Sequence, residues 1–509
     1  VARREIPRSN WQDDRPLTLA LPDATAAVFR ITFENKTPLD LSVFRFSSAA
    51  RLDDWEGRAG FVLRSLDRGA PPVQDRAAWV ASKDVLDLST KMDGEGRLDW
   101  KAPSGNWTVL RFGHVNTGAK NGPAPPEATG FECDKLSTAG ADAHFAGYIG
   151  RVSAPGGPAD GGRLKGMVID SWECHTQTWT PAMEAEFLKW RGYELRKWLP
   201  VLAGMVVENH ETSGRFLRDW RATLNDLLVA NYYSRLALLG RQRGMKLSFE
   251  SGPGDVPTGD ILQYYGRADI PMCEFWWPND PHWGGFETKP MLPAVSAAHV
   301  YGKPRIAAEA FTNIGLRWDE HPFMLKHLAD RHFAMGLTHL VFHTYTHNPD
   351  LEMVPGTSFG RGIGTPFLRG QTWWKHMPLF TGYIARCGFM LEQGVPVSDA
   401  LWYLGDDLAH KPRQDEAFPE GHKFDYLNSD ALTGRITVDG GLLKTPEGLS
   451  WKFLYLPKAP ALSIPSLEKI RDLVAQGAVV LGLPSFQNPS LSGDEKRFAA
   501  MLKELWGEN

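Results

Sequence analysis

The chain has 509 residues and a net charge of −4, with 42% hydrophobic and 23% charged residues. That length allows about two to four domains, and the weak negative charge gives no electrostatic case for nucleic-acid binding. No apolar run reaches the length of a membrane span. The four cysteines lie far apart and fit neither a zinc pattern nor a dense disulfide framework, so we expect buried free thiols.

The first part of the chain, residues 1–130, has a β-type pattern. Apolar and polar residues alternate at 29–33, 41–46 and 105–112, and Gly, Asp and Pro residues separate these runs. Alternation of this kind predicts strands with one buried face. We therefore expect a β-sandwich-like or inserted β region over residues 1–130.

Residues 131–394 then change to alternating strands and helices, which is typical of an α/β fold with a parallel sheet. The pattern predicts clear strands at 167–169, 246–250, 269–274, 305–309 and 339–343 and a weak one at 201–207. The strand at 167–169 is expected to be buried on both faces. A complete (β/α)8-type barrel has eight strands, so we expect a barrel that is incomplete in this chain or that has strands hidden from the pattern.

Residues 395–509 have the pattern of a separate, small doubly wound α/β domain. Strands are predicted at 397–404, 452–457 and 478–483, with a helix at 463–476. The segment has no Gly-x-Gly-x-x-Gly fingerprint, so it is assigned no nucleotide.

Polar side chains follow the predicted barrel strands at their carboxyl ends. In a barrel these ends meet at one mouth, where catalytic groups are placed. A single strand-end carboxylate is more often a helix cap, but a set of them favours a functional site. The residues in question are Asp170, Glu173, Glu250, Glu274, Glu309 and His343.

Two carboxyl groups on opposite sides of a glycosidic bond are the minimum machinery of glycoside hydrolysis. Glu173 and Glu309 are the best candidates, because both end strands that the pattern predicts clearly and both have apolar neighbours that can raise a pKa. Spacing alone does not tell which one is the acid. The chain also has 19 Trp residues. Flat rings beside carboxylates, such as Trp172 and Trp276, suit sugar rings, although core packing is the alternative for any one of them.

The remaining acids, Asp170, Glu250 and Glu274, would repel one another at one mouth unless a cation lies among them. Oxygen ligands favour a hard ion such as calcium, and neutralisation by Arg or Lys is an equal alternative. His343 and His347 can pair with carboxylates to hold zinc. Their spacing and the loop between them favour contacts with sugar hydroxyls instead.

Several motifs together resemble glycoside hydrolase family 106, the α-L-rhamnosidases, over roughly residues 105–405. The resemblance implies a catalytic (β/α) barrel with appended β domains, inversion of configuration, and calcium that holds rhamnose hydroxyls. Glu173 takes the place of the general acid and Glu309 that of the general base. The motifs lie at 170–181, 248–250, 308–312, 341–349 and 371–374.

The resemblance also implies a carbohydrate substrate containing terminal L-rhamnose, polysaccharide degradation, and a secreted or periplasmic location. Asp170 and Glu274 fall among the calcium-binding acids. The expected substrate-binding residues are Asp170, Trp172, Glu250, Trp276, His343 and His347. For inversion, the two catalytic carboxyl groups should lie about 6.5–9.5 Å apart. The alternatives are another barrel glycosidase, such as a β-galactosidase-like enzyme, and a non-catalytic carbohydrate-binding protein.

Overall fold

A computed structural model gives the structure of the chain in two compact units. Unit 1 comprises residues 1–116, 181–223 and 490–492, and unit 2 comprises residues 117–180, 224–489 and 493–509. Each unit is described by itself. The structure describes residues 3–4, 16–35, 41–62, 64, 79–122, 124–250, 259–277, 291–315, 318–359, 362–408, 420–457, 461–483 and 486–507.

The largest sheet of unit 2 is parallel throughout, in the order β1-β2-β3-β4-β5. Because strand order follows chain order and helices connect the strands, the sheet has the arrangement of a (β/α) barrel. Within the described residues it contains five strands, so the α/β class is confirmed and a complete eight-stranded barrel is not. The strands are β1 (Gly166–Ile169), β2 (Lys246–Glu250), β3 (Ile270–Trp276), β4 (Ala307–Thr312) and β5 (His339–Phe342).

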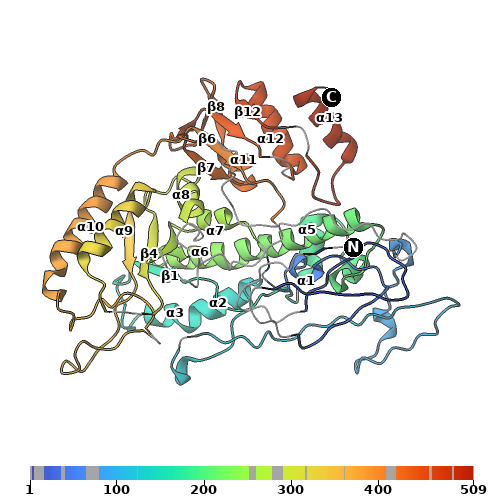
Figure 1. Ribbon diagram of the computed structural model, residues 1–509, viewed down its shortest axis with the longest axis horizontal. Helices are drawn as coiled ribbons and strands as arrows, with labels where there is room; N and C mark the ends of the chain where they lie inside the picture. Colours follow the sequence, from blue (N-terminus) through green and yellow to red (C-terminus); the bar gives the residue numbers. More distant parts are fainter. Residues whose placement is uncertain are drawn as a thin grey trace. The chain divides into compact units, whose positions relative to one another are not determined.

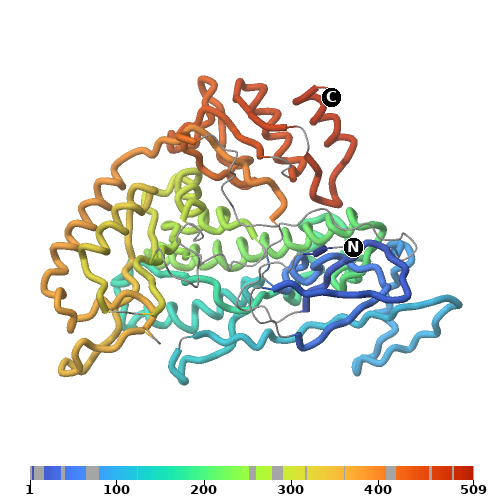
Figure 2. Tube along the Cα trace, in the orientation of Figure 1, coloured from blue at the N-terminus to red at the C-terminus, as the bar shows by residue number. Residues whose placement is uncertain are grey.

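Helices of unit 2 cover the sheet, and Figures 1 and 2 show the course of the chain between them. Helix α8 packs against β3, α6 against β2, and α9 packs against α10. Two clusters of aromatic rings fill the interior, one around Tyr233 and Phe249 and one around Phe311. The helices are α2 (Thr138–Gly147), α3 (Ile149–Val152), the π-helix η6 (Leu228–Tyr233), α6 (Ser234–Arg241), α7 (Ile261–Arg267), α8 (Met291–Val300), α9 (Pro322–Ala334) and α10 (Met377–Glu392).

Strand β1 is less buried than its sequence suggests. Val168 is 60% exposed, whereas Met167 is 9% exposed. The prediction of burial on both faces is therefore wrong. The reason is that β1 is the outer strand of the described sheet and pairs only with β2 there, so an apolar run of three residues need not have a cover on both sides.

Strand β4 contains a β-bulge at Phe311. Ala310 lies opposite Phe275 of β3, and the next residue of β3, Trp276, lies opposite Thr312, so Phe311 is the extra residue. Its φ is +70°, a left-handed conformation that is rare for a bulky side chain. A bulge shifts the alternation of side chains by one position, and it therefore turns Thr312 to the face of the sheet that carries Glu309.

A second parallel sheet of unit 2, in the order β12-β11-β6-β7, confirms the strands predicted within 395–509. Helix α8 also packs against β7, and both sheets belong to the same compact unit. Four short strands and the helix α11 here were not predicted. The elements are β6 (Ala400–Tyr403), β7 (Phe424–Leu427), α11 (Ser429–Arg435), β8 (Thr437–Asp439), β9 (Leu442–Lys444), β10 (Ser450–Trp451), β11 (Phe453–Tyr455), α12 (Ile464–Ala475), β12 (Val479–Leu481) and α13 (Glu495–Trp506).

Unit 1 is built from short helices and irregular chain. Its core includes Trp198, stacked on Phe216 at 5.7 Å between ring centroids. Helix α5 begins in unit 1 and ends in unit 2. The elements of this part are α1 (Trp55–Arg58), the 3-10 helices η2 (Ser82–Asp84), η3 (Ser89–Lys91) and η5 (Arg196–Ala203), and the helices α4 (Met183–Arg191) and α5 (His210–Leu227); the 3-10 helix η4 (Pro126–Ala128) lies in unit 2.

Four strand predictions in this part of the chain are wrong. Residues 29–33, 41–46 and 105–112 have no strand pairing among the described residues, and their large side chains, such as Val109 at 58%, are exposed. Alternation makes a strand only where a neighbouring segment supplies the ladder hydrogen bonds, and the described residues of 1–130 form only isolated bridges. The fourth wrong prediction is the weak strand at 201–207. Residues 201–203 end the 3-10 helix η5, and 204–205 form a turn and irregular chain.

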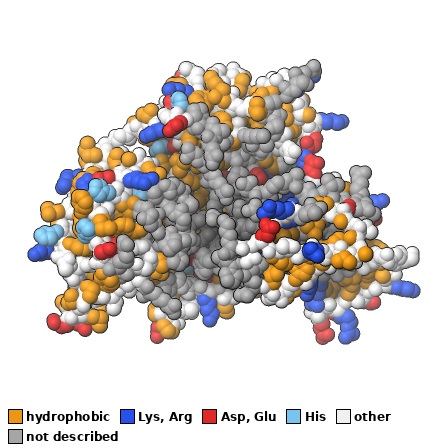
Figure 3. All heavy atoms as spheres, in the orientation of Figure 1, with side chains coloured by type: hydrophobic (Ala, Val, Ile, Leu, Met, Phe, Trp, Pro, Cys, Tyr) orange, Lys and Arg blue, Asp and Glu red, His pale blue; other side chains and the backbone are white. Residues whose placement is uncertain are grey.

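Figure 3 shows hydrophobic side chains among the charged ones on the visible face.

Two further features bear on function. All four cysteines are free, as expected, but only Cys273 is buried, whereas Cys133, Cys174 and Cys387 are partly exposed. Within the described chain, every helix is too short or too polar to cross a membrane.

Candidate active site

The carboxyl ends of the five parallel strands bring most of the predicted polar residues to one edge of the sheet. Asp170 follows β1 directly, Glu250 ends β2, and Glu274 and Glu309 lie directly opposite each other on β3 and β4. His343 follows β5, and its backbone N–H bonds to the carbonyl of Ala310. The parallel register of the five strands therefore places these residues at the same edge of the sheet, as predicted.

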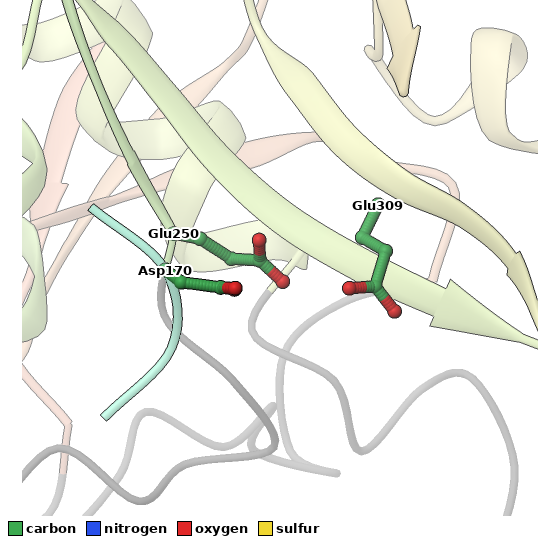
Figure 4. A group of neighbouring side chains, drawn as sticks. All are labelled: Asp170, Glu250 and Glu309. Carbon is green, nitrogen blue, oxygen red and sulfur yellow. The ribbon is translucent and has the colours of Figure 1, made fainter. Parts of the chain in front are cut away.

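Three of the acids form a close group. Oxygen atoms of Asp170, Glu250 and Glu309 lie within 4.8 Å of one another. In Figure 4 the side chains of Asp170 and Glu250 lie side by side, and that of Glu309 comes from β4, which β3 separates from β2. Within the described residues this is the one group of His, Cys, Asp and Glu that has the spacing of a metal site. Its all-oxygen donor set fits a hard cation such as calcium.

Glu250 is the most deeply buried member of this group, with 2% of its surface exposed. Burial raises the pKa of its carboxyl well above the usual value, and the negative charges of Glu309, Asp170 and Glu274 raise it further. A hydrogen bond to Asp170 acts in the same direction. These effects all favour the uncharged form of Glu250, and a bound cation would oppose them.

Glu309 has a different environment. Burial raises the pKa of its carboxyl, while His343 and a hydrogen bond from Thr312 lower it, and Asp170 and Glu173 raise it. The Thr312 hydroxyl donates to Oε1 of Glu309, and Nδ1 of His343 lies 3.7 Å from the same oxygen. The net effect is a raised pKa, which is suited to a general base.

Glu173 lies on the loop after β1 and is exposed. Its Oε1 accepts a hydrogen bond of 2.6 Å from the hydroxyl of Ser171, whose backbone N–H donates to Asp170 at 2.9 Å. The charge of Glu173 contributes to the raised pKa of Glu309, so the two carboxyls of the predicted pair belong to one electrostatic environment.

The two predicted tryptophans are buried beside acidic residues. Trp172 is 5% exposed, and its indole N–H donates to the carbonyl of Cys174 at 2.8 Å. Trp276 is 7% exposed and donates to Oε2 of Glu274 at 3.0 Å. Rings buried in this way hold the backbone and a carboxylate in place, and they present little open surface on which a sugar can stack.

The two predicted histidines have separate places. His343 belongs to the acidic group through Glu309, and Nδ1 of its ring lies 3.3 Å from the hydroxyl of Thr312. His347 is exposed on the loop beyond β5. Neither histidine belongs to the group with metal-site spacing, so the geometry of the described residues gives the zinc hypothesis no support.

Two polar contacts of the site were not predicted. Thr312 and Ser171 each donate a hydroxyl to one of the two proposed catalytic glutamates. Both hydroxyls lie within three residues of a predicted glutamate in the sequence. Their positions depend on the bulge in β4 and on the irregular chain after β1, and neither segment has a glycine or proline that would have predicted its course.

Comparisons with known proteins identify the family of the chain. The family described as alpha-L-rhamnosidase matches residues 8–509. A protein of Formosa agariphila that is provisionally named a beta-glucuronidase is 37% identical over 438 residues, which are 85% of this chain and 36% of that protein. The solved structure of a rhamnosidase from Novosphingobium sp. PP1Y is 30% identical, with a TM-score of 0.80, over 90% of this chain and 45% of that one.

This chain thus spans less than half of the length of either relative. The family match covers nearly all of its residues. It includes β1 to β5, whose carboxyl ends carry the acidic residues and form what we call the acidic edge of the sheet. The chain therefore belongs to glycoside hydrolase family 106, the alpha-L-rhamnosidase family.

Proposed function

We propose that the protein containing this chain is an inverting α-L-rhamnosidase, in which Glu173 is the general acid and Glu309 the general base. Glu173 is exposed and can approach the oxygen of the leaving group. Glu309 is held by Thr312 and His343 beside the acidic group, where it can take a proton from the attacking water. The observation that carries the proposal is the pair of carboxyls with different surroundings at one edge of a barrel-type sheet.

A calcium ion is part of the proposal. Asp170 and Glu250 would hold it together with Glu309, and Glu274 lies opposite Glu309 on the neighbouring strand. The fit rests on the close carboxylate oxygens. Burial first, and then the negative charges of its acidic neighbours, raise the pKa of Glu250, and a cation would offset those charges. When bound, the ion would supply positive charge for the hydroxyls of the sugar.

The name of the Formosa relative makes a β-glucuronidase the second candidate. A glucuronide carries a carboxylate, and the charges that raise the pKa of Glu250 are all negative. Without a cation such a site repels an anionic sugar, whereas a bound calcium ion would offset that repulsion. What favours L-rhamnose over glucuronic acid is the family match together with the similarity to a solved rhamnosidase.

The test is hydrolysis of p-nitrophenyl α-L-rhamnoside and p-nitrophenyl β-D-glucuronide by the full-length protein, with proton NMR of the first sugar anomer released. We expect rhamnoside hydrolysis with inversion, and a loss of at least about 10³-fold in Glu173→Gln or Glu309→Gln on an unactivated rhamnoside. Glu211→Gln is the control, since that glutamate is exposed and pairs with Arg215 on α5.

Other outcomes would change the assignment. Retention of configuration would show that the second carboxylate acts as a nucleophile and not as a general base. Hydrolysis of the glucuronide alone would favour the second candidate, and activity on β-galactosides a different barrel glycosidase. Binding of L-rhamnose without hydrolysis would indicate a carbohydrate-binding protein. The proposed secreted or periplasmic location is tested by fractionation of the producing cells.

A further inference from the structure

A buried lysine lies behind the loop that carries Glu173. Only 6% of Lys135 is exposed. Its ammonium group forms an ion pair with Glu132, lies 3.7 Å from Sγ of Cys174, and lies 5.0 Å from the ring centroid of Trp172. Burying a charge in this way is costly unless each contact is satisfied, so these partners determine where the side chain lies.

The ammonium stays charged at neutral pH. Burial lowers the pKa of Lys135, but the interactions with Cys174 and Glu132 outweigh burial, and the pKa is raised above its usual value. A second aromatic ring, that of Tyr232, lies 5.7 Å from the ammonium. The cation therefore has an acidic partner and two aromatic faces, a combination that holds it in one position.

Three hydrogen bonds attach the same segment to the same loop. The backbone N–H of Lys135 donates to Oε1 of Gln177 at 2.8 Å, and Nε2 of Gln177 donates to the carbonyl of Cys133 at 2.8 Å. The hydroxyl of Thr180 donates to Asp134 at 2.7 Å. We call residues 171–180 the acid loop and the contacts of Lys135 with Glu132, Trp172 and Cys174 the lysine clamp.

Glu173 lies between the two loop residues that Lys135 contacts. Trp172 is buried, and its indole N–H donates to the carbonyl of Cys174, so this contact links the two residues on either side of Glu173. The clamp therefore fixes both neighbours of Glu173 and leaves its carboxyl exposed. Displacing these neighbours would displace the carboxyl without changing its chemistry.

We propose that Lys135 is a positioning residue for Glu173, and that the lysine clamp sets where the carboxyl of the general acid stands relative to the glycosidic oxygen. This inference rests on the proposed role of Glu173 as the acid. Misplacing a catalytic group by about 1 Å can cost about 10²-fold in rate, so loss of the clamp affects proton donation before it affects sugar binding.

Leaving groups separate this role from a merely structural one. Protonation matters most when the leaving oxygen is strongly basic, and little when the leaving group is a good one. For Lys135→Met we expect kcat/KM to fall about 10²-fold with phenyl α-L-rhamnoside and less than about 3-fold with 2,4-dinitrophenyl α-L-rhamnoside. Competitive inhibition by free L-rhamnose should be unchanged.

The chain contains a matched control. Lys189 forms an ion pair with Glu186 at 3.0 Å and lies 5.1 Å from the ring centroid of Trp190, but its side chain is 63% exposed on α4. Lys189→Met removes the same kinds of contact from the surface and should leave kcat/KM unchanged with both substrates. Lys135→Arg keeps the charge and should recover part of the loss with the phenyl substrate.

Hydrogen–deuterium exchange gives a readout independent of activity. In Lys135→Met we expect faster exchange in residues 171–180 and unchanged exchange in β2 to β5. Equal losses with both substrates, or unchanged exchange in the acid loop, would overturn the positioning role. If the unmutated protein hydrolyses neither rhamnoside, the proposed function fails instead, and the acid role of Glu173 with it.

Discussion

The hydroxyl of Thr312 donates a hydrogen bond to Oε1 of Glu309. These residues are three apart on β4 and would face opposite sides of an unbroken strand. The bulge at Phe311 brings them to the same face. The hydrogen bond favours the charged form of the carboxylate and opposes the effect of burial on its pKa.

Replacement of Thr312 by Val should therefore raise the pKa of Glu309. The base acts in its ionised form, so the acidic limb of the profile of kcat/KM against pH should move to higher pH. On that limb we expect kcat/KM to fall by about 10-fold or more, because hydrogen bonds to charged groups contribute about 1.5–3 kcal/mol. Thr312→Ser should restore the wild-type limb.

The control for this variant is Thr433→Val, which removes a hydroxyl that donates to the carbonyl of Ser429 on α11. Its pH profile should match that of the wild type. An acidic limb that stays in place in Thr312→Val would show that Thr312 does not set the ionisation of the base.

Glu250 should make stability depend on pH. Because its pKa is raised from 4.5 in the folded state, the native protein binds a proton more tightly than the unfolded chain. The free energy of unfolding should then fall as pH rises from about 4.5 toward the folded-state pKa. Glu250→Gln removes this dependence and should stabilise the protein near pH 7.5 by about 1–3 kcal/mol.

Urea unfolding in EDTA at pH 4 and pH 7.5 measures the effect. The difference between Glu250→Gln and wild type should nearly vanish at pH 4, where the carboxyl is protonated in both states. A difference of equal size at both pH values would contradict the burial of an ionisable group at this position.

Calcium should stabilise the folded protein through the acidic group. A ligand at about 100 times its Kd adds about 2.7 kcal/mol, and this should appear as a calcium-dependent rise in Tm in an EDTA-treated sample. Asp170→Asn should remove most of that rise. Asp439→Asn, which removes an exposed carboxylate paired with Lys444, should retain it. Equal shifts in the two variants would place calcium elsewhere.

The bulge predicts an unusual order of stability at residue 311. Phe311 is fully buried and contacts the rings of Phe275 and Phe342, so Phe311→Ala should cost about 3–5 kcal/mol. Its φ of +70° suits glycine. We therefore expect Phe311→Gly to be more stable than Phe311→Ala by about 1 kcal/mol, measured by urea unfolding. If residue 311 lay in a regular strand, Phe311→Ala would instead be more stable than Phe311→Gly.

The sequence predicted the acidic edge well because the signal is local. Residues 246–250 were predicted as a strand with Glu250 at its end, and the structure has β2 over Lys246–Glu250. In a parallel sheet, strand ends lie side by side by register, so correct strands suffice to bring Glu274 next to Glu309. Burial and bulges depend on neighbours far along the chain, which explains why the exposure of Val168 and the place of Thr312 were not predicted.

The region 1–130 shows the opposite case. Its alternation resembles that of β2, but the described part forms isolated bridges rather than a ladder. Periodicity measures what a segment prefers, and a sheet needs a partner as well. The strand prediction at 201–207 was wrong for another reason. A short apolar run fits a buried helical turn as well as a strand.

The bulge in β4 also makes the length of the Glu309–Thr312 segment as important as its composition. Insertion or deletion of one residue at 310–311 would leave both polar side chains present and rotate one of them away from the other. Changes in segment length here should therefore be far less tolerated than substitutions. An alignment of related chains that allows a gap between this glutamate and this threonine would pair residues that cannot have the same function.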